Sequence, residues 1–338
     1  MRKLASIRKI NEIRPIKDAD AIECAVVSGW SVVVKKGEYK VGDLAVYCEI
    51  DSWIPIELAP FLQKGDRAHE FEGVIGNRLR TICLRGQLSQ GLLLTLNSAL
   101  PFTNSFVEGD DVTEALGIKK WEPVIPAQLA GEVKGAFPSL IPKTDQERCQ
   151  NLVEEIKAAH ECNSLFEITE KLEGSSMTVY RIHGEFGVCS RNIDLEETGG
   201  SAFWATARAE DIESKMIAVD EHWDFAIQGE LIGPGIQNNI YKLSKPEFHV
   251  YDVYNVQSGK YLDPVARREL IASMGLKHVP IVACDKDLGV GSVSDLLEWA
   301  EGPSRLYEKQ EREGIVFKQV NGDMSFKAIS NKYLLGEK

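Results

Sequence analysis

The chain has 338 residues, of which 43% are hydrophobic and 27% charged; this composition is typical of globular proteins, and the length predicts about two domains. With 51 acidic and 39 basic residues, the formal net charge of −12 excludes a globally basic nucleic-acid-binding protein. There is no apolar run of about 18 residues and no signal-peptide stretch at the start, so we expect a cytoplasmic protein without membrane spans. Seven cysteines without a C-x-x-C pair argue against a zinc knuckle and for reduced thiols.

Charge is distributed unevenly along the chain. Residues 1–120 contain 16 Lys and Arg against 16 Asp and Glu, so the whole acidic excess lies in 121–338. An acidic second half is common on solvated surfaces, but it can also supply carboxylates that bind metal ions.

The first hundred residues predict short β-strands. Residues 21–37, 39–55 and 77–96 each contain strand-like runs interrupted by glycine turns. About five short strands predict a small barrel or sandwich. Residues 121–143 contain four prolines, and we expect a linker there.

The second half predicts an α+β domain with mostly antiparallel strands. Residues 144–147, Thr-Asp-Gln-Glu, have a capping-box pattern followed by apolar residues at helical spacing, which predicts a helix from about residue 144. Residues 165–174 predict a strand, 176–191 a hairpin and 201–219 one helix. Later strands are expected over 224–233, 247–256, 313–320 and 324–330, and later helices over 263–275 and 293–302.

The first motif that carries chemistry is Lys171-Leu172-Glu173-Gly174, at the end of a predicted strand. A lysine whose pKa is lowered by burial or nearby cations becomes a nucleophile. A carboxylate two residues further on can hold a metal ion through water, and glycine permits a sharp turn. Alone, the pattern is weak, and a surface lysine before a turn is the favoured explanation of it.

Further motifs follow in chain order. They are Cys189-Ser190-Arg191-Asn192, Gln228-Gly229-Glu230-Leu231, Phe248-His249-Val250-Tyr251-Asp252, Glu313-Gly314-Ile315-Val316-Phe317-Lys318 and Ser325-Phe326-Lys327. Each has a plain structural interpretation: the charged residues could be solvated, and Phe248 and Val316 could belong to the core. Together, carboxylates near a nucleophilic lysine can organise a divalent cation, and two further lysines can neutralise phosphate charge.

In this order and spacing, the motifs resemble those of the covalent nucleotidyltransferases, which comprise DNA ligases, RNA ligases and mRNA capping enzymes. Residues 7–55, 78–94 and 142–152 are more specifically similar to the Deinococcus-type nick-sealing RNA ligases, which have a Naegleria relative. This resemblance implies an N-terminal OB-fold barrel (1–120), a linker (121–143) and an ATP-dependent adenylation domain (144–338) of antiparallel sheets flanked by helices. It also implies joining of RNA 3′-OH and 5′-phosphate ends at nicks.

The resemblance implies a role for each matching residue. Lys171 would attack ATP and carry AMP, and we expect burial and a nearby metal ion to lower its pKa. The metal ion, Mn²⁺ or Mg²⁺, would be held by Glu173, Glu230 and Glu313. Nucleotide contacts are implied for Arg191 at the ribose, Phe248 and Val316 around the adenine, Lys318 and Lys327 at the α-phosphate, and Arg148 at the β- and γ-phosphates.

The sequence departs from the family pattern at two places. Related ligases often have K-x-K in the last motif, whereas here the second position is Ile329; Lys332 is a candidate substitute. Glu173 stands where many members have aspartate, which keeps the charge but lengthens the side chain. Neither departure removes the nucleophile.

The N-terminal barrel has two possible roles. It could bind single-stranded RNA through a basic groove and stacking residues; the candidates are Lys35, Lys36, Arg78, Arg80, Arg85, Trp30 and Tyr39. It could instead only support the catalytic domain, as the zero net charge of 1–120 suggests.

Three functions therefore remain open. The first is an ATP-dependent RNA ligase acting as a monomer on broken RNA. The second is a DNA ligase or capping enzyme, which the early position of the β-module disfavours, and the third is an RNA-binding protein with an inactive ligase domain.

Overall fold

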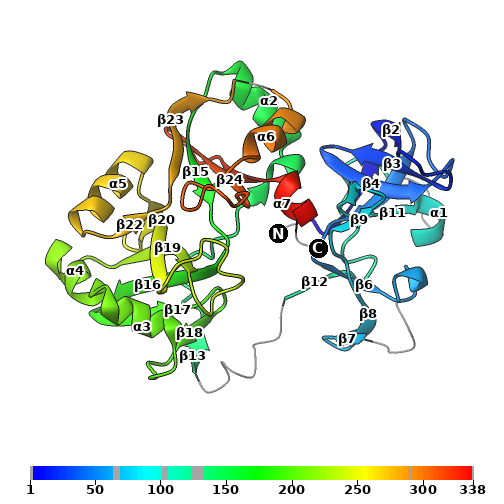
Figure 1. Ribbon diagram of the computed structural model, residues 1–338. Coiled ribbons are helices and arrows are strands. Elements are labelled where there is room, and N and C mark those ends of the chain that lie inside the picture. Colours follow the sequence, from blue (N-terminus) through cyan, green and yellow to red (C-terminus); the bar gives the residue numbers. More distant parts are fainter. Residues whose placement is uncertain (1–2, 64–68, 101–105, 123–131, 290, 337–338) are drawn as a thin grey trace. The chain divides into compact units, whose positions relative to one another are not determined.

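Figure 1 shows the computed structural model of the chain, which describes residues 3–63, 69–100, 106–122, 132–289 and 291–336. The chain divides into two compact units: Met1–Val124 with Leu335–Lys338, and Ile125–Leu334. The fold is α+β, with an N-terminal barrel-type unit of short strands and a second unit of antiparallel sheets and helices. Within the described residues, no helix is long and apolar enough to cross a membrane.

The strands of the first unit are short and almost all pair with antiparallel neighbours. The pairing orders are β1-β5-β11, β2-β3-β4, β12-β6-β8-β7 and β10-β9. Their bounds are β1 Ala5–Lys9, β2 Glu12–Pro15, β3 Ile22–Val27, β4 Trp30–Lys35, β5 Leu44–Cys48, β6 Ser52–Pro55, β7 His69–Phe71, β8 Val74–Arg78, β9 Ile82–Leu84, β10 Gln87–Ser89, β11 Leu92–Thr95 and β12 Lys119–Lys120, with the short helix α1 at Leu96–Ala99.

Alternating side chains build the core of this unit. Trp30, Val32 and Val34 of β4 are buried, and they pack in one cluster with Tyr47 of β5. This is the period of two expected for a strand that covers a core on one face. The strands predicted around 21–37, 39–55 and 77–96 are all present.

Two sheets form the second unit. The larger runs in the order β13 (Val133–Ala136), β18 (Ile193–Leu195), β17 (Glu185–Cys189), β16 (Ser175–Ile182), β19 (Phe225–Ile232), β20 (Glu247–Asn255) and β21 (Lys260–Tyr261), with β22 (Lys277–His278) beside β20. The smaller is β14 (Glu147–Arg148), β25 (Ser325–Ile329), β24 (Gly314–Gln319), β15 (Leu165–Lys171) and β23 (Ile281–Asp287).

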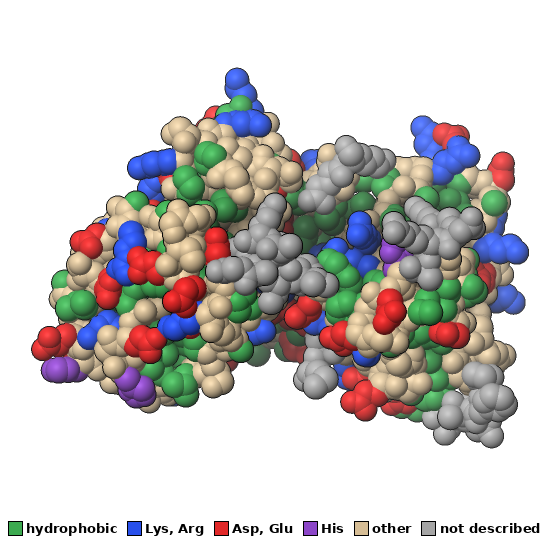
Figure 2. All heavy atoms as spheres, turned by 90° about the horizontal axis from the view of Figure 1, so that it is seen from below, with side chains coloured by type: hydrophobic (Ala, Val, Ile, Leu, Met, Phe, Trp, Pro, Cys, Tyr) green, Lys and Arg blue, Asp and Glu red, His purple; other side chains and the backbone are tan. Residues whose placement is uncertain are grey.

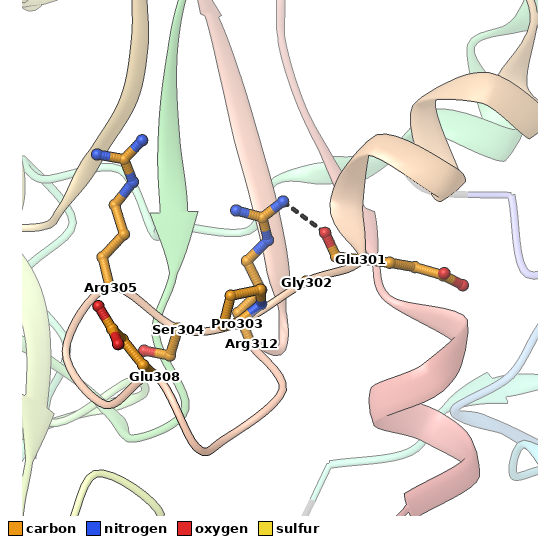
Figure 3. A pocket seen from close by; sticks show the side chains of 7 residues that line it. All are labelled: Glu301, Gly302, Pro303, Ser304, Arg305, Glu308 and Arg312. Atoms are coloured by element: carbon orange, nitrogen blue, oxygen red, sulfur yellow. Dashed lines mark hydrogen bonds between the residues drawn. The ribbon is translucent and has the colours of Figure 1, made fainter.

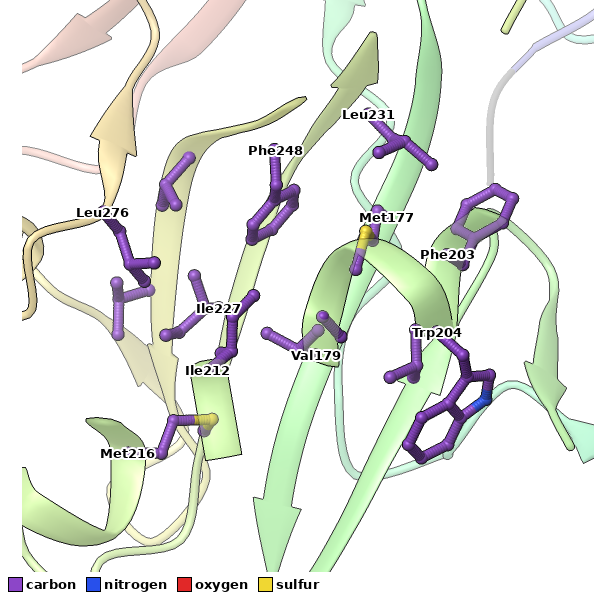
Figure 4. Packing of buried hydrophobic residues seen from close by; sticks show 14 of the residues in the cluster. Met177, Val179, Phe203, Trp204, Ile212, Met216, Ile227, Leu231, Phe248 and Leu276 are labelled. Carbon is purple, nitrogen blue, oxygen red and sulfur yellow. The ribbon is translucent and has the colours of Figure 1, made fainter. Parts of the chain in front are cut away.

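Helices cover one face of each sheet. The bounds are α2 Val153–Glu161, α3 Ala202–Ala209, α4 Ile212–Val219, α5 Pro264–Ser273, α6 Val293–Ala300 and α7 Asn331–Gly336. Side chains of α3, α4 and α5 pack with the larger sheet in one buried cluster, part of which Figure 4 shows. Side chains of α2 and α6 pack with the smaller sheet. The opposite face of the larger sheet carries a second apolar cluster that includes Tyr180, Ile182, Cys189 and Ala226, whereas the opposite face of the smaller sheet carries Lys171, Lys318 and Lys327.

Gly174 joins the two sheets at the turn between β15 and β16. A Cβ atom at this position would lie 2.4 Å from the Leu231 carbonyl oxygen of β19. The glycine is therefore required by a close approach of two backbones.

The structure differs from the predicted elements at three places. Thr144 does not cap a helix: residues 147–148 form β14, and α2 starts only at Val153. The helix expected over 201–219 is broken into α3 and α4, because Asp211 adopts a left-handed conformation with φ of 50°. Within the expected linker, Val133–Ala136 forms β13 and pairs with β18.

Acidic and basic side chains are interspersed on the surface of the second unit, on the face that Figure 2 draws. The charge excess in 121–338 is therefore not gathered into one patch on that face.

Candidate active site

The polar face of the smaller sheet gathers several of the predicted site residues. In β15 and β24, Lys171 is paired with Gly314 and Thr169 with Val316. Val316 is paired in turn with Lys327 of β25, which lies beside Arg148 of β14. Because side chains two residues apart share a face, Lys171, Val316, Lys318, Lys327 and Arg148 all lie on the face opposite the helices.

Lys171 ends β15 and forms an ion pair with Glu313. Its Nζ donates to Glu313 Oε1 at 2.6 Å, and 26% of the lysine side chain is exposed. Burial by itself would lower the pKa of Lys171, but the carboxylates of Glu313 and Glu230 outweigh it and raise that pKa. The expected lowering of the Lys171 pKa includes a nearby metal ion and stays a prediction; without the ion, the two carboxylates act in the opposite direction.

Glu313 is positioned by the segment that precedes it. Ser304 Oγ donates to Glu170 Oε1 at 2.6 Å, and the Arg305 backbone N–H donates to Glu170 Oε2 at 2.8 Å. Because Glu170 is the neighbour of Lys171, these bonds fix the 301–312 segment against the strand that carries Lys171. Glu313 follows that segment directly.

The same segment encloses a pocket of about 420 Å³, shown in Figure 3. Arg312 lines it and donates to the carbonyls of Trp299, Ala300 and Glu301 at 2.7–2.9 Å. These carbonyls end α6, so Arg312 caps the helix C-terminus. This contact stabilises the segment that leads to Glu313.

Glu230 lies across from the smaller sheet, in β19 of the larger one. It is paired with Ser176 of β16. Burial raises the pKa of Glu230 to about 8, with Lys171 acting against this and Glu313 adding to it. Because the charges of Lys171 and Glu313 both affect this pKa, Glu230 lies near them and belongs to the same site.

Glu173 is held by the loop between β19 and β20. Its Oε1 accepts a hydrogen bond from the Asn238 side-chain amide at 2.9 Å, and its backbone N–H donates to the Tyr241 hydroxyl at 2.6 Å. Its other oxygen, Oε2, is buried and has no hydrogen-bond partner among the described residues.

These carboxylates are suited to a divalent cation. In the described part of the chain, no three His, Cys, Asp or Glu side chains form a ready-made metal cluster. A buried carboxylate oxygen without a partner is nevertheless a position that a cation or its bound water would satisfy. Mg²⁺ and Mn²⁺ suit such oxygen ligands, and Mg²⁺ usually keeps several waters, so the donor set fits a hydrated ion.

The structure does not bring Phe248 to this site. Phe248 is paired with Leu231, and both are completely buried in the cluster under the helices, as Figure 4 shows. Glu230, the next residue in β19, therefore points to the opposite face of the sheet from Phe248. Val316, in contrast, lies on the site face and is only partly buried.

Tyr251 is the aromatic residue of β20 that reaches the site. Its hydroxyl lies 3.2 Å from Ser176 Oγ and 2.9 Å from Thr144 Oγ1. Alternation places Tyr251, three residues after Phe248, on the opposite face of β20, which is the face of Glu230. The register shift opposite Gln228 and Gly229 acts after it and returns Val253 to the helix-covered cluster. Alternation from a buried Phe248 could therefore have identified Tyr251 from sequence.

Lys318 is nearly buried beneath Tyr251. Its Nζ donates to the Tyr251 carbonyl at 2.6 Å and to Asp252 Oδ1 at 2.7 Å. Burial lowers the pKa of Lys318 to about 8, although Asp252 acts in the opposite direction. Asp252 lies inside the motif quoted above, but its role as a partner of Lys318 was not predicted.

Asp252 belongs to a buried ionic network. Arg267 of α5, only 1% exposed, donates to Asp252 Oδ1 at 3.4 Å, to His278 Nε2 at 3.2 Å and to Glu167. Arg268 also donates to Glu167. Burial lowers the pKa of His278 to about 4, and the neighbouring Arg267 adds to this. Removing one member would leave another charge buried and unpaired.

Arg191 and Lys327 are connected by Asp145. Arg191 Nη2 lies 3.3 Å from Asp145 Oδ2, and Lys327 Nζ lies 3.5 Å from Asp145 Oδ1. Because Arg191 comes from the larger sheet and Lys327 from the smaller, residues 142–148 connect the two. Asp145 itself was not predicted as a site residue.

Lys332 does not lie with Lys327. It is in α7, 65% exposed, and pairs with Glu301 at 2.8 Å. Replacement of the second lysine of the last motif by Lys332 is therefore not supported.

The proposed stacking residues of the first unit are not accessible. Trp30 is 1% exposed and Tyr39 is 5% exposed, and both belong to the core. Arg78 lies 3.7 Å from the centre of the Trp121 ring and pairs with Asp51. The remaining basic candidates, Lys35, Lys36, Arg80 and Arg85, are exposed.

Each of the two units contains a match to a known protein family. Residues 4–96 match an OB-fold domain family, and residues 164–332 match the RNA ligase family. A search of curated proteins found no match.

Solved structures of a Naegleria gruberi RNA ligase are similar to this chain throughout. The structure with PPi is 46% identical, covers 100% of this chain and 99% of its own, and has a TM-score of 0.87. A lysine-to-alanine variant with ATP and Mn, and a glutamate-to-alanine variant with AMP and Mn, are each 46% identical with TM-scores of 0.88 over 99% of both chains.

Proposed function

The chain belongs to the RNA ligase family, and we propose on that premise that it is an ATP-dependent ligase that seals nicks by joining RNA 3′-OH and 5′-phosphate ends through a lysyl-AMP intermediate. The observation that carries the proposal is the position of Lys171. Lys171 is the last residue of an interior strand and shares a sheet face with Lys318 and Lys327. Its amine donates a hydrogen bond to Glu313 and interacts electrostatically with Glu230.

In the first step, Lys171 Nζ attacks the α-phosphorus of ATP. A P–N bond forms, the bond between the α-phosphorus and the bridging oxygen breaks, and pyrophosphate leaves. The amine must first lose a proton, because only the neutral form is a nucleophile. A bound divalent cation supplies positive charge that lowers the pKa of Lys171 and stabilises charge on the phosphate. When the P–N bond forms, the ion pair between Lys171 and Glu313 is lost.

The second and third steps transfer AMP and then release it. The 5′-phosphate of the broken strand attacks the lysyl-AMP phosphorus, which breaks the P–N bond and returns the proton to the amine. The 3′-OH then attacks the activated 5′-phosphorus, a phosphodiester forms, and AMP leaves. Each step requires in-line positioning more than new covalent chemistry.

We assign the nucleotide contacts from the placements described above. Lys318 and Lys327 would neutralise the α-phosphate, and Arg148, beside Lys327, would reach the β- and γ-phosphates. Arg191 would contact the ribose. Val316 and Tyr251 would contact the adenine, with Tyr251 in place of the expected Phe248.

We propose ATP as the nucleotide and Mn²⁺ or Mg²⁺ as the metal ion. The Naegleria ligase structures with ATP and Mn support this choice. Glu173, Glu230 and Glu313 are the residues proposed to hold the ion, and the unpartnered Glu173 Oε2 supports a place for it.

The test is transfer of label to the protein. The purified chain is treated with pyrophosphate to remove any bound AMP, incubated with α-labelled ATP and Mn²⁺, and denatured. We expect label from ATP and not from GTP, and no label on a Lys171→Ala variant. Label that persists on the variant would identify another nucleophile. Absence of label on the folded wild type would instead favour an RNA-binding protein with an inactive ligase domain.

The labelled protein is then used to test which kind of nick it seals. A nicked duplex whose 3′-OH strand ends in RNA should be sealed, and the all-DNA duplex should not. Equal sealing of both would contradict the RNA-repair part of the proposal.

A further inference from the structure

The loop between β19 and β20, residues 233–246, lies against Glu173. It is unusual in backbone conformation, since Gln237, Asn239 and Lys242 all have positive φ angles between 44° and 56°. Such angles are uncommon for residues other than glycine and mark a loop shaped by its surroundings.

Buried side chains and internal hydrogen bonds hold this loop in place. Ile236 is 7% exposed and Tyr241 is 3% exposed. The Asn239 side chain accepts from the Leu243 N–H and donates to the Leu243 carbonyl, both at 3.1 Å. Tyr241 fixes the position of the loop on the catalytic segment, because its hydroxyl accepts from the Glu173 N–H at 2.6 Å.

Asn238 stands between these anchors and contacts a single oxygen of Glu173. Its side-chain amide donates to Oε1 at 2.9 Å, and its backbone N–H lies 3.4 Å from the same atom. Both donors therefore point at Oε1. The other oxygen, Oε2, is buried and has no partner among the described residues.

The different surroundings of Oε1 and Oε2 matter because glutamate has a long side chain. Glutamate has one more rotatable bond than the aspartate that the family resemblance leads us to expect, so its carboxylate can adopt more positions. Two donors on Oε1 fix the rotation of the group. They leave Oε2 as the oxygen that can face a cation or its bound water.

We propose that Asn238 is a positioning residue for the metal site: it holds Glu173 Oε1 so that Oε2 is presented to the divalent cation. The inference rests on the proposed function, which places the cation at Glu173. Asn238 does not contact the reacting atoms and acts through Glu173. The sequence gives no indication of this role, because Asn238 lies 65 residues from Glu173 in a segment without a motif.

The experiment measures Mn²⁺ binding without nucleotide or turnover. The intact protein is titrated with Mn²⁺, and free Mn²⁺ is followed by its electron paramagnetic resonance signal. The variants are Glu173→Gln, Asn238→Ala and Ser244→Ala, the last being an exposed polar residue on the same loop. Loss of a partner that orients a ligand typically weakens metal binding about 10–100-fold. We expect about tenfold weaker binding for Asn238→Ala and unchanged binding for Ser244→Ala.

The variants separate failure of the inference from failure of the proposed function. If Glu173→Gln abolishes binding but Asn238→Ala does not change it, Asn238 has no positioning role and the metal site stands. If Glu173→Gln binds Mn²⁺ as the wild type does, the assignment of the ion to Glu173 is wrong, and the inference fails with it.

A double-mutant cycle distinguishes positioning from general damage to the loop. Aspartate at position 173 has a shorter side chain that cannot keep the same bond to Asn238. Asn238→Ala should therefore weaken Mn²⁺ binding in the wild type but have little further effect in Glu173→Asp. Equal weakening in both backgrounds would show that Asn238 acts through the loop structure and would overturn the proposal.

Discussion

The two faces of the smaller sheet are built from alternate residues of the same strands, yet they have opposite character. The helix-covered face carries Phe166, Phe317 and Phe326, each completely buried and packed ring against ring. The other face carries Lys171 and Lys318, whose amines pair with Glu313 and with Asp252 of the larger sheet.

The difference shows how stability and chemistry are separated within one strand. On the apolar face, each side chain contributes by removing its own surface from water. On the polar face, a side chain depends on a specific partner, since a buried charge without one is costly. Changes on the first face should therefore lower stability, and changes on the second should lower activity and also cost stability where they leave a buried charge unpaired.

The largest effect is expected on the apolar face. Phe317→Ala removes a ring that contacts Phe326 at 4.6 Å and Trp299 at 5.6 Å between ring centres. We expect a loss of about 3–5 kcal/mol in the free energy of unfolding, measured by urea denaturation. Val316→Ala, one residue away on the other face, serves as the control and should cost much less. Comparable losses in the two variants would contradict the division between the faces.

A second effect is expected on the polar face, in activity. Lys318→Met keeps the length of the side chain but removes the charge beside the proposed phosphate site. We expect adenylate formation to slow by about 10²–10³-fold, measured in a single turnover, together with a lower melting temperature, because Asp252 loses a buried cationic partner. If the variant unfolds readily but the surviving folded protein reacts at the normal rate, Lys318 belongs to the scaffold.

The ionic network behind the polar face predicts a pH dependence of stability. Burial lowers the pKa of His278 from its ordinary value of 6.5 to about 4 in the folded protein, so the unfolded chain binds its proton first as the pH falls. Stability from this residue is complete above pH 6.5 and is lost between pH 6.5 and 4, by at most about 3 kcal/mol. His278→Gln should flatten this part of the profile of unfolding free energy against pH. The exposed His222→Gln is the control, and an unchanged slope in His278→Gln would contradict the assignment.

The smallest effect is expected outside both faces. Lys332→Ala breaks an exposed ion pair with Glu301, and such pairs contribute little. We expect adenylate formation and melting temperature to match the wild type within error. A clear loss of adenylation would return Lys332 to the list of site residues.

The elements that the sequence predicted well are those with a regular pattern. The hairpin of β16 and β17 and the strands that carry Lys171, Glu230 and Lys318 follow from alternation and turn residues. The order of the motifs predicted Lys171 as the nucleophile, which stays a prediction, and the sheet register places Lys318 and Lys327 on the same face as Lys171.

Most of the residues that were missed depend on features that a linear pattern does not contain. Tyr251 is the exception, because alternation from the buried Phe248 already places it on the face of Glu230. Asn238 reaches Glu173 through a loop whose course is fixed by contacts distant in sequence. Trp30 and Tyr39 are residue types that can stack on bases, but both are buried in the core and cannot contact a ligand.

The position of β15 inside its sheet has a consequence for exchange of backbone hydrogens with solvent. β15 is bonded on one side to β24 and on the other to β23, so both edges of the strand that carries Lys171 are covered. Exchange of its backbone amide hydrogens should require opening of the whole sheet and be among the slowest in the molecule.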